Sequence, residues 1–497
     1  EIENSILNRK ITTKLESKLK ANSVNEFLKF SVVTTSRDKK NINPTTLISD
    51  VSAEKYENLK KAHTKLWSDR WSVSEVKVKG DNDAQMAIST SIYHLLRAHV
   101  EDDRVAIDAK GYAGEGYFGR FFWDTEMYLL PFYCYTDHKR AKTLASFRVQ
   151  SLEGAKKNAT LLGYKGAKYA WESDSEGIES CALWQYRDHE IHITADVVYG
   201  FQHYIAASED KEFSKRSAET VVETARYWVD RVNYDPSRSI YSLAGVMGPD
   251  EYAPLSINNS YTNRLVKFAL EAAVDVGAVG GASTEEIKKF KQIADKLILP
   301  RNENDVVLQS EEFEKLADPD FDTFWKDRSK PYAAQVNQER IYRTKNLKQA
   351  DVLLLMWLFP NEFSSEDLSK AWNYYLPVTT HDSSLSAAIH SMIAQKLKMW
   401  DEAWNFWEKG AFLDLNFDSD GPAEGIHIAA AGGVWLMAIF GFAGLSSALD
   451  SEVLTLSPKL PKKWESLEFP LTWKKNKLHI RVNKSGTIIS NSSKDEI

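Results

Sequence analysis

The pattern of apolar positions is helical over most of the chain. From residue 53 to about 445, apolar residues recur at spacings of three and four, which places them on one face of successive helices. A dozen or so helices without alternating strands exclude a Rossmann fold and a TIM barrel, and they suit a ring of paired helices, an (α/α)6 barrel. The predicted helices cover 53–68, 82–99, 124–136, 138–162, 188–208, 211–234, 260–277, 284–298, 346–358, 364–375, 384–397, 400–412 and 427–441.

The two ends of the chain are patterned differently. Residues 1–52 are polar, apart from FLKFSVVTT at 27–35, which predicts a strand. After 445, short alternating segments predict strands at 453–458, 467–473, 477–483 and 486–491. We therefore expect a mainly α fold in three parts: a remnant N-terminal β domain and linker (1–52), the barrel (53–445) and a small C-terminal β unit (446–497).

Composition narrows the class of protein. The chain has 497 residues and a net charge of −7, which argues against a nucleic-acid surface. No run of about 18 apolar residues occurs, so no membrane span is predicted. The two cysteines, Cys134 and Cys181, are too few for a disulfide framework or a zinc site, and we expect both to be buried and reduced. The 15 tryptophans and 21 tyrosines slightly favour a sugar site, where rings stack on pyranose faces.

Signals for localisation point in two directions. The chain opens on Glu1 without an apolar leader, which favours the cytoplasm. The last four residues, KDEI at 494–497, are similar to the endoplasmic-reticulum retention signal. Four N-x-S/T sequons begin at Asn158, Asn258, Asn483 and Asn491. We expect a cytoplasmic protein, with residence in the secretory pathway as the alternative.

Two segments pair an aromatic ring with a carboxylate. GYAGEGYFGRFFWDTE at 111–126 contains a G-x-G-x-x-G spacing, but no apolar strand precedes it, so a dinucleotide site is not indicated. We interpret it as a Gly-rich loop that delivers Trp123 and Asp124 to a pocket. Trp171 and Glu172 repeat the pairing in the segment 164–177. Such a pair suits one sugar, because the ring stacks on it and the carboxylate accepts hydroxyl hydrogens.

Asp250 and Glu251 are neighbours in the segment GVMGPDEY, where the preceding Gly-Pro pair predicts a turn. A carboxyl that is partly desolvated beside a second carboxylate has a raised pKa and can act as general acid on a glycosidic oxygen. Most acidic pairs in turns are solvated on the surface, so the pattern alone does not show whether this pair is catalytic. Lys348 and Gln349, in LKQAD, are candidate hydroxyl ligands or solvated residues at a helix edge.

Several histidines stand beside small or polar residues. HDSSLS at 381–386 and AEGIHIAAAGG at 423–433 both come at predicted helix starts, where backbone N–H groups, hydroxyls and imidazoles form an anion site. His189 and His192 are three apart and could meet one metal ion, but no further ligand motif accompanies them. We expect a structural or sugar-contacting role for this pair, and no metal site.

Taken in order, these blocks resemble the signature of glycoside hydrolase family 65. The resemblance runs from about 55 to 483 and covers GEGYFGRFFWDTE, GYKGAKYAWES, HEIHITAD, GPDEY, LKQAD, HDSSLS and EGIHIAAAGG. It implies an (α/α)6 barrel and inverting chemistry on α-glucosides. Members include phosphorylases of maltose, trehalose, kojibiose and nigerose, and a smaller set of hydrolases. No cofactor is implied, and inorganic phosphate serves as co-substrate.

The resemblance also implies residue roles. Glu251 matches the general acid. The residues that match the glucose subsite are Trp123, Asp124, Trp171, Glu172, Lys348 and Gln349. The residues that resemble the phosphate-binding blocks are His381, Ser383, Ser384 and His427.

Two departures from the family leave alternatives open. Members carry a β-sandwich before the barrel, and here only FLKFSVVTTSRD resembles its final strand, so we expect a second chain, a cleaved N-terminal piece or a homodimer partner. Residues 327–346 also depart, which leaves the disaccharide open. Glu424 would be the base if the enzyme were a hydrolase. A carbohydrate-binding subunit without catalysis is the third alternative, which the intact GPDEY opposes.

Overall fold

The structure is a computed structural model, which describes residues 2–8, 10–35, 38, 43–416 and 425–493. The chain divides into two compact units, Glu1–Asp69 and Arg70–Ile497. The division falls inside one helix, α2 (Tyr56–Ser72). The boundary expected near residue 52 stays a prediction.

The first unit contains a β-hairpin and a helix. Strands β1 (Ile2–Leu7) and β2 (Lys10–Leu15) pair antiparallel. Helix α1 (Pro44–Ala53) begins at Asn43, whose side chain accepts a hydrogen bond from the Thr45 N–H. The strand predicted at 27–35 is wrong, because these residues form no β-ladder with any described strand. Residues prone to form strands need a second strand to complete their backbone hydrogen bonds, and here the side chains of Phe27 and Val33 are exposed instead.

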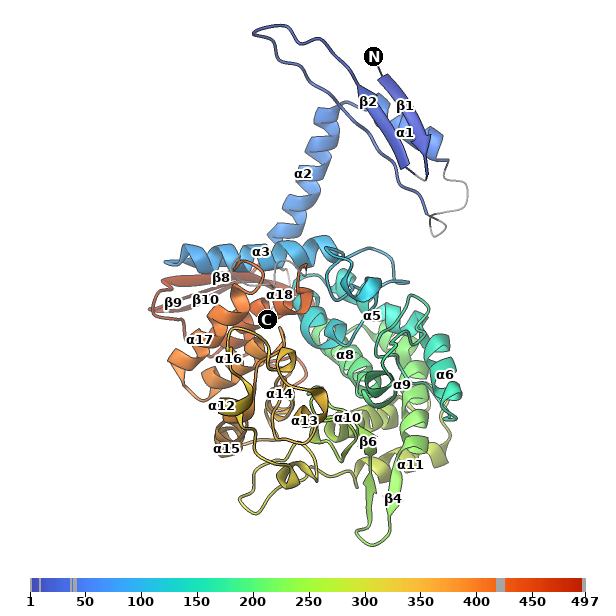
Figure 1. Cartoon of the computed structure of the whole chain (residues 1–497), viewed down its shortest axis with the longest axis vertical. Helices are drawn as coiled ribbons and strands as arrows, with labels where there is room; N and C mark the ends of the chain where they lie inside the picture. The colour runs from blue at the N-terminus through green and yellow to red at the C-terminus, as the bar shows by residue number, and fades with distance from the viewer. Residues whose placement is uncertain (1, 9, 36–37, 39–42, 417–424, 494–497) are drawn as a thin grey trace. The chain divides into compact units, whose positions relative to one another are not determined.

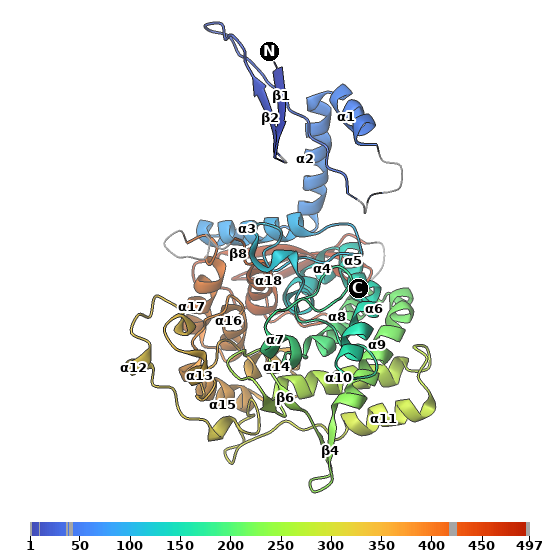
Figure 2. The same cartoon turned by 45° about the vertical axis from the view of Figure 1, so that its right-hand side comes forward.

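The second unit is a ring of helices around a buried centre. In its described part, six inner elements each contact the next, and the sixth returns to the first (Figures 1 and 2). They are η2 (Thr125–Leu129) continuing as α4 (Leu130–Thr136), α8 (Ile193–Ser208), α10 (Ser260–Val276), α14 (Val352–Leu358), α16 (Ser386–Lys396) and α18 (Ile428–Leu436) continuing as η7 (Met437–Phe442).

Outer helices cover the inner ones, which confirms the predicted (α/α)6 barrel. They are α3 (Asn82–Ala98), α5 (His138–Gln150), α9 (Lys211–Arg231), α11 (Thr284–Ala294), α15 (Ser365–Tyr375) and α17 (Trp400–Ala411). Outer helices are amphipathic because one face meets solvent, whereas every residue of α18 is buried. Ser283 and Ser364 begin α11 and α15 with capping boxes.

Short elements occupy the connections. They are α6 (Leu152–Leu161), α7 (Trp184–His189), α12 (Phe321–Phe324), α13 (Gln338–Ile341), the hairpin of β4 (Asn233–Asp235) and β5 (Ile240–Ser242), and the ladder of β6 (Ala244–Val246) and β7 (Ser256–Ile257). Single 3-10 turns lie at Gly116–Gly119, Phe313–Lys315, Tyr332–Ala334 and Leu376–Val378.

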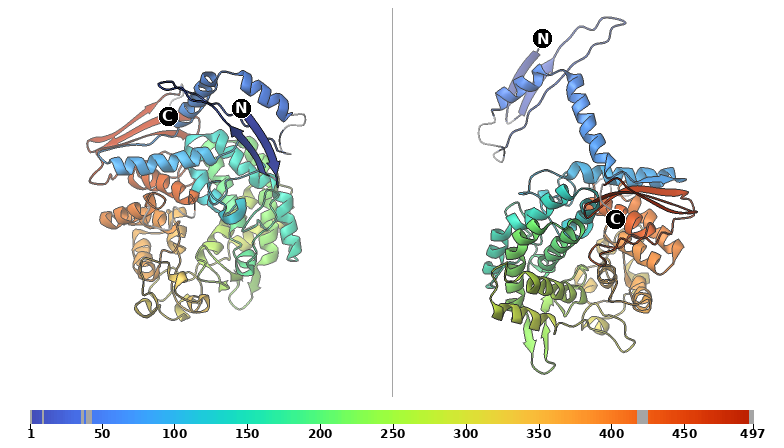
Figure 3. Two further views of the ribbon diagram at one scale, coloured as in Figure 1. Left: turned by 45° about the horizontal axis from the view of Figure 1, so that its top comes forward. Right: turned by 180° about the vertical axis from the view of Figure 1, so that it is seen from behind.

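A four-stranded antiparallel sheet follows the barrel in sequence. Strands β8 (Ser466–Trp473), β9 (Asn476–Asn483) and β10 (Gly486–Asn491) match the predictions, and β3 (Lys77–Lys79) joins at the edge in the order β10-β9-β8-β3. Figure 3 shows the sheet beside α3. The strand predicted at 453–458 is wrong, since only an isolated bridge between Leu456 and Leu445 forms there.

Cys134 and Cys181 are buried free thiols, as predicted. Among the described residues, no helix is both long and apolar enough to cross a bilayer.

Candidate active site

One cavity of about 270 Å³ collects the predicted site residues. It lies where η2, α16 and α18 begin, and its wall includes Trp123, Asp124, Trp171, Glu172, Glu251, Lys348, Gln349, Ser383, Ser384 and His427. His381 is not among the lining residues. Glu424 lies outside the described residues, so its position is left open.

The loop between β6 and β7 presents Glu251 to this cavity. Its neighbour Asp250 is fully buried and anchors the loop, accepting hydrogen bonds from the Lys348 N–H (2.7 Å) and from Nε2 of Gln309 (2.8 Å). Gly248 is required for close packing, since a Cβ there would lie 2.5 Å from Nδ2 of Asn259. These contacts fix the loop, so that Glu251 lines the cavity while Asp250 stays behind it.

The sequence suggested a raised pKa in this acidic pair, and the structure shows it at Asp250. Burial raises the pKa of Asp250 to about 7, opposed by the hydrogen bonds from Gln309 and the Lys348 N–H and assisted by the charge of Asp351. Asp250 is therefore a buried support of the loop rather than a group that reaches substrate.

Lys348 contacts the predicted acid directly. Its Nζ lies 2.9 Å from Oε1 of Glu251. Burial alone would lower the pKa of Lys348, but the charge of Glu251 and the hydrogen bond to it raise that pKa above its ordinary value. Gln349 donates through Nε2 to the Pro249 carbonyl, and its buried Oε1 has no partner among the described residues. An acceptor in the cavity wall is thus available to a ligand.

The two ring-and-carboxylate pairs are aligned by backbone bonds. Phe121 and Ser173 exchange two hydrogen bonds of 2.9 Å each, which brings Trp123 and Trp171 to the same wall. The carboxylate of Glu179 accepts from the N–H groups of Trp171 (2.7 Å) and of Glu172 (3.1 Å). Arg120 binds Glu172 at 2.5 Å.

Asp124 is the other carboxylate of these pairs. Burial raises the pKa of Asp124 to about 7, and the charge of Glu126 adds to the rise. A hydrogen bond from its own backbone N–H opposes this rise, and the side chain lines the cavity. The carboxyl of Asp124 is therefore placed to meet a ligand.

His189 and His192 are held in place by hydrogen bonds and ring contacts. Nδ1 of His192 contacts Oδ2 of Asp196 at 2.6 Å, and its ring packs edge-on against Trp123 at 5.0 Å. Nδ1 of His189 contacts the Gly245 carbonyl at 2.7 Å. In the described residues no group of three or more His, Cys, Asp or Glu side chains is arranged to hold a metal ion.

Hydrogen-bond donors and positive charge gather at the starts of α16 and α18. Ser383 and Ser384 precede α16, and His427 precedes α18. Nδ1 of His427 faces Oδ1 of Asp414 at 2.7 Å, while its Nε2 lies 3.1 Å from Nζ of the buried Lys110. Because a carboxylate only accepts, Nδ1 carries the hydrogen and Nε2 accepts from Lys110. This wall suits an anion, since helix N-termini add further positive potential.

His381 points away from that wall. Its Nδ1 lies 2.8 Å from Oγ of Ser386, and its ring packs against His390 at 4.6 Å and Phe406 at 5.1 Å. Burial, assisted by His390 and Lys409, lowers the pKa of His381 to about 2, so the ring is neutral. Its place is that of a support for the Ser383 loop.

Sequence reasoning missed several residues of the site. Lys110 and Tyr186 line the cavity, and Glu179 and Asp414 hold lining residues in place. The one usable signal was at Lys110, a lysine directly before the Gly-rich loop. The others belong to no motif, and only the folded chain brings them to the site.

Two family models match this chain. Residues 89–436 match the model of the glycosyl hydrolase family 65 central catalytic domain, and residues 448–497 match that of the family's C-terminal domain. A solved structure described as a putative kojibiose phosphorylase from the human microbiome superposes with a TM-score of 0.85 at 31% identity, covering 91% of this chain and 64% of that one.

Curated relatives are disaccharide phosphorylases by name. Kojibiose phosphorylase of Halothermothrix orenii is 32% identical over 97% of this chain and 67% of that protein. α,α-Trehalose phosphorylase of Thermoanaerobacter brockii is 34% identical over 88% of this chain and 58% of that protein. The chain thus spans about two thirds or less of the length of these relatives. It belongs to glycosyl hydrolase family 65, a family of carbohydrate-active enzymes.

Proposed function

We propose that this chain is the catalytic body of an inverting α-glucoside phosphorylase. It cleaves a glucose disaccharide with inorganic phosphate and releases β-glucose 1-phosphate. The observation that carries the proposal is the single cavity that joins Glu251 to an anion-suited wall of Ser383, Ser384, His427 and Lys110. Relatives named kojibiose, nigerose and maltose phosphorylase support the same reaction class.

The ring-and-carboxylate wall would hold the glucose that is transferred. Trp123 and Trp171 offer apolar surface to the C–H groups of a pyranose. Asp124, Glu172 and the free Oε1 of Gln349 accept hydroxyl hydrogens. This arrangement holds the sugar between the acid and the phosphate. Holding the reacting groups in the correct geometry lowers the barrier of such reactions.

Glu251 is the proton donor in this scheme. It gives its proton to the glycosidic oxygen as the bond from that oxygen to C1 breaks. A phosphate oxygen forms a bond to C1 from the opposite face, which inverts the anomeric configuration. The proton that the phosphate loses on becoming a monoester balances the one that Glu251 gave to the leaving sugar.

Phosphate needs donors and positive charge but no base, because it is already an anion. Lys110, the Ser383 and Ser384 hydroxyls and the starts of α16 and α18 supply both. His381 enters this scheme as a support of the serine loop. Inverting hydrolysis would instead require a second carboxylate roughly 6.5–9.5 Å from the acid to activate water.

The test is an assay with trehalose, maltose, kojibiose and nigerose, each with and without inorganic phosphate. We expect cleavage of one of them to require phosphate and to yield β-glucose 1-phosphate. The NMR signal of the anomeric proton identifies this product. A chelator should leave the rate unchanged, because the scheme uses no metal. Cleavage without phosphate that releases free β-glucose would replace the proposal with a hydrolase, and Glu424 would then be the base to test. Sugar binding without cleavage under either condition would favour the non-catalytic subunit.

A further inference from the structure

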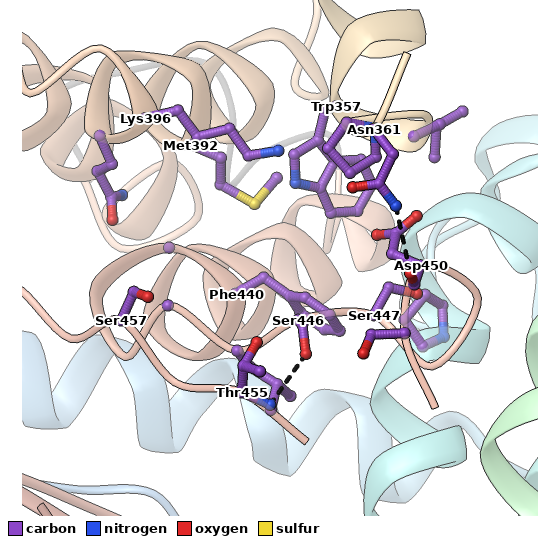
Figure 4. A pocket seen from close by; sticks show the side chains of 18 of the residues that line it. Trp357, Asn361, Met392, Lys396, Phe440, Ser446, Ser447, Asp450, Thr455 and Ser457 are labelled. Carbon is purple, nitrogen blue, oxygen red and sulfur yellow. Dashed lines mark hydrogen bonds between the residues drawn. The ribbon is translucent and has the colours of Figure 1, made fainter. Parts of the chain in front are cut away.

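A second cavity lies at the opposite end of the barrel. It has a volume of about 500 Å³ and shares no described lining residue with the active-site cavity. Trp357 and Lys396 reach it from the ends of α14 and α16, and Phe440 reaches it from η7 (Figure 4). Helix α16 has the Ser384 loop at one end and Lys396 at the other, and the helix between them is about 15 Å long at 1.5 Å per residue.

We propose that this second cavity binds a neutral carbohydrate of one or two sugar units. The proposal concerns a site distinct from the active site, so it does not rest on phosphorolysis. Three properties of the wall carry it: buried polar atoms without partners, a separated amine and carboxylate, and aromatic faces.

Two deeply buried polar side chains of the wall have unused hydrogen-bonding atoms. Gln395 is 7% exposed and His203 is 3% exposed, and both line the cavity. Oε1 of Gln395 and Nδ1 of His203 have no hydrogen-bond partner among the described residues. Buried polar atoms are costly when they are left unpaired, so these atoms indicate a ligand rich in hydrogen-bonding groups.

Lys396 and Asp450 supply a donor and an acceptor that are not paired with each other. Neither side chain forms an ion pair within 4.0 Å of a described partner, yet both line the cavity, and Figure 4 shows both extending toward the space beside Trp357. The side chain of Lys396 is exposed and that of Asp450 is half-buried. Desolvation raises the pKa of Asp450 to about 6, opposed by the charge of Lys396. Hydroxyl groups both donate and accept, so a polyol satisfies the two at once.

The other residues of the cavity wall favour a neutral sugar over phosphate. Trp357 and Phe440 offer ring surface to C–H groups, and the hydroxyls of Ser446, Ser447 and Ser457 lie on the same side as Phe440. Helices α14 and α16 end here, and the negative ends of their helix dipoles lower the potential of this wall. That end disfavours phosphate, in contrast to the active-site end, where α16 and α18 begin. A neutral sugar fits the whole set.

The experiment counts sugar sites on the full chain by isothermal titration with D-glucose and maltose. We expect two sites in the wild type. Asp124→Asn should weaken the active-site event only. Lys396→Met and Asp450→Asn should each weaken the other event on the order of 10- to 100-fold, since each removes a hydrogen bond to a charged group. Lys288→Met, on the exposed face of α11, is the matched control and should leave both events unchanged.

Three outcomes would overturn the proposal. The first is a single sugar site that Asp124→Asn removes. The second is a second site that both cavity variants leave intact. The third is binding of inorganic phosphate or glycine, rather than a sugar, that depends on Lys396. Thermal unfolding of each variant shows that the chain is folded, and retained turnover by Lys396→Met shows that the active-site end is intact.

Discussion

Lys348 holds both carboxylates of the Asp250–Glu251 pair. Its backbone N–H donates to Oδ1 of Asp250 at 2.7 Å, and its side-chain Nζ lies 2.9 Å from Oε1 of Glu251. One residue of the LKQAD segment therefore sets the position of the GPDEY loop through its backbone and contacts the proposed acid through its side chain. The two functions can be separated by mutation, because only the second is lost with the side chain.

Replacement of Glu251 tests the general acid. Glu251→Gln should lower kcat on an unactivated disaccharide by on the order of 10²- to 10⁴-fold, because the leaving oxygen goes unprotonated. Turnover of α-glucosyl fluoride with phosphate should fall far less, since fluoride departs without a proton. Steady-state kinetics on both substrates measures the difference. Near-normal turnover of the disaccharide would show that another group is the acid.

Replacement of Lys348 tests the ion pair. Lys348→Met should lower kcat/KM by on the order of 10- to 100-fold, because Glu251 and the bound sugar lose a charged hydrogen-bond donor. The unfolding temperature should change little, since the backbone N–H still anchors Asp250. Lys345→Met is the matched control, as its ammonium pairs with the exposed Asp318 instead. Equal kinetics for the two variants would remove Lys348 from the site.

Helical periodicity predicts most of this fold, because the helices of the barrel bury apolar residues that recur every three or four positions. Helices α3, α10 and α16 lie within a few residues of their expected bounds. The strand expected at 27–35 fails for a physical reason: β-propensity describes side chains that pack on a sheet, and Phe27 and Val33 pack on none.

The site is less predictable because its parts meet only in three dimensions. The family resemblance points to Trp123 and Glu251, but nothing local shows that Lys110 will contact His427, 317 positions later. The sequence also cannot assign the raised pKa within the acidic pair. Burial decides that property, and burial of Asp250 depends on Gln309 and Lys348 from other segments.

Sugar binding should depend on pH through Asp124. Burial raises the pKa of Asp124 to about 7, so the carboxyl is protonated below that pH and ionised above it. The ionised form accepts hydrogens at both oxygens and more strongly than the protonated form, so KM for the disaccharide should fall as pH rises from 6 to 8. Asp124→Asn should bind weakly at both pH values, like the protonated wild type. A wild-type KM that is equal at pH 6 and 8 would contradict this role.

The first unit should be covered in the functional protein. The side chains of Leu7, Ile11 and Val33 are 74%, 70% and 86% exposed, which is unfavourable for apolar groups gathered on one small unit. We propose a second polypeptide, a cleaved N-terminal piece or a second copy of the chain as the cover. Light scattering of the native material should give a mass above the 56.5 kDa of this chain. A monomer of 56.5 kDa as the only species would contradict the proposal.

Replacement of the anion wall should affect phosphate more than sugar. Ser383→Ala with Ser384→Ala should raise KM for phosphate by about 30-fold, since each of the two hydroxyls contributes about 1 kcal/mol as a donor. Lys110→Met should raise it further, because it removes a buried positive charge beside His427. KM for the disaccharide should change little in either variant. Ser369→Ala, on the exposed side of α15, is the control for the serine replacements.

Replacement of His381 tests whether this residue contacts phosphate or only supports the serine loop. Its ring contacts Ser386, His390 and Phe406 rather than the cavity. His381→Asn should therefore lower the unfolding temperature without the selective rise in KM for phosphate, because it disturbs packing behind the loop and removes no donor from the anion. A selective rise equal to that of the serine variants would place His381 in direct contact with phosphate. The anion wall would then extend to His381.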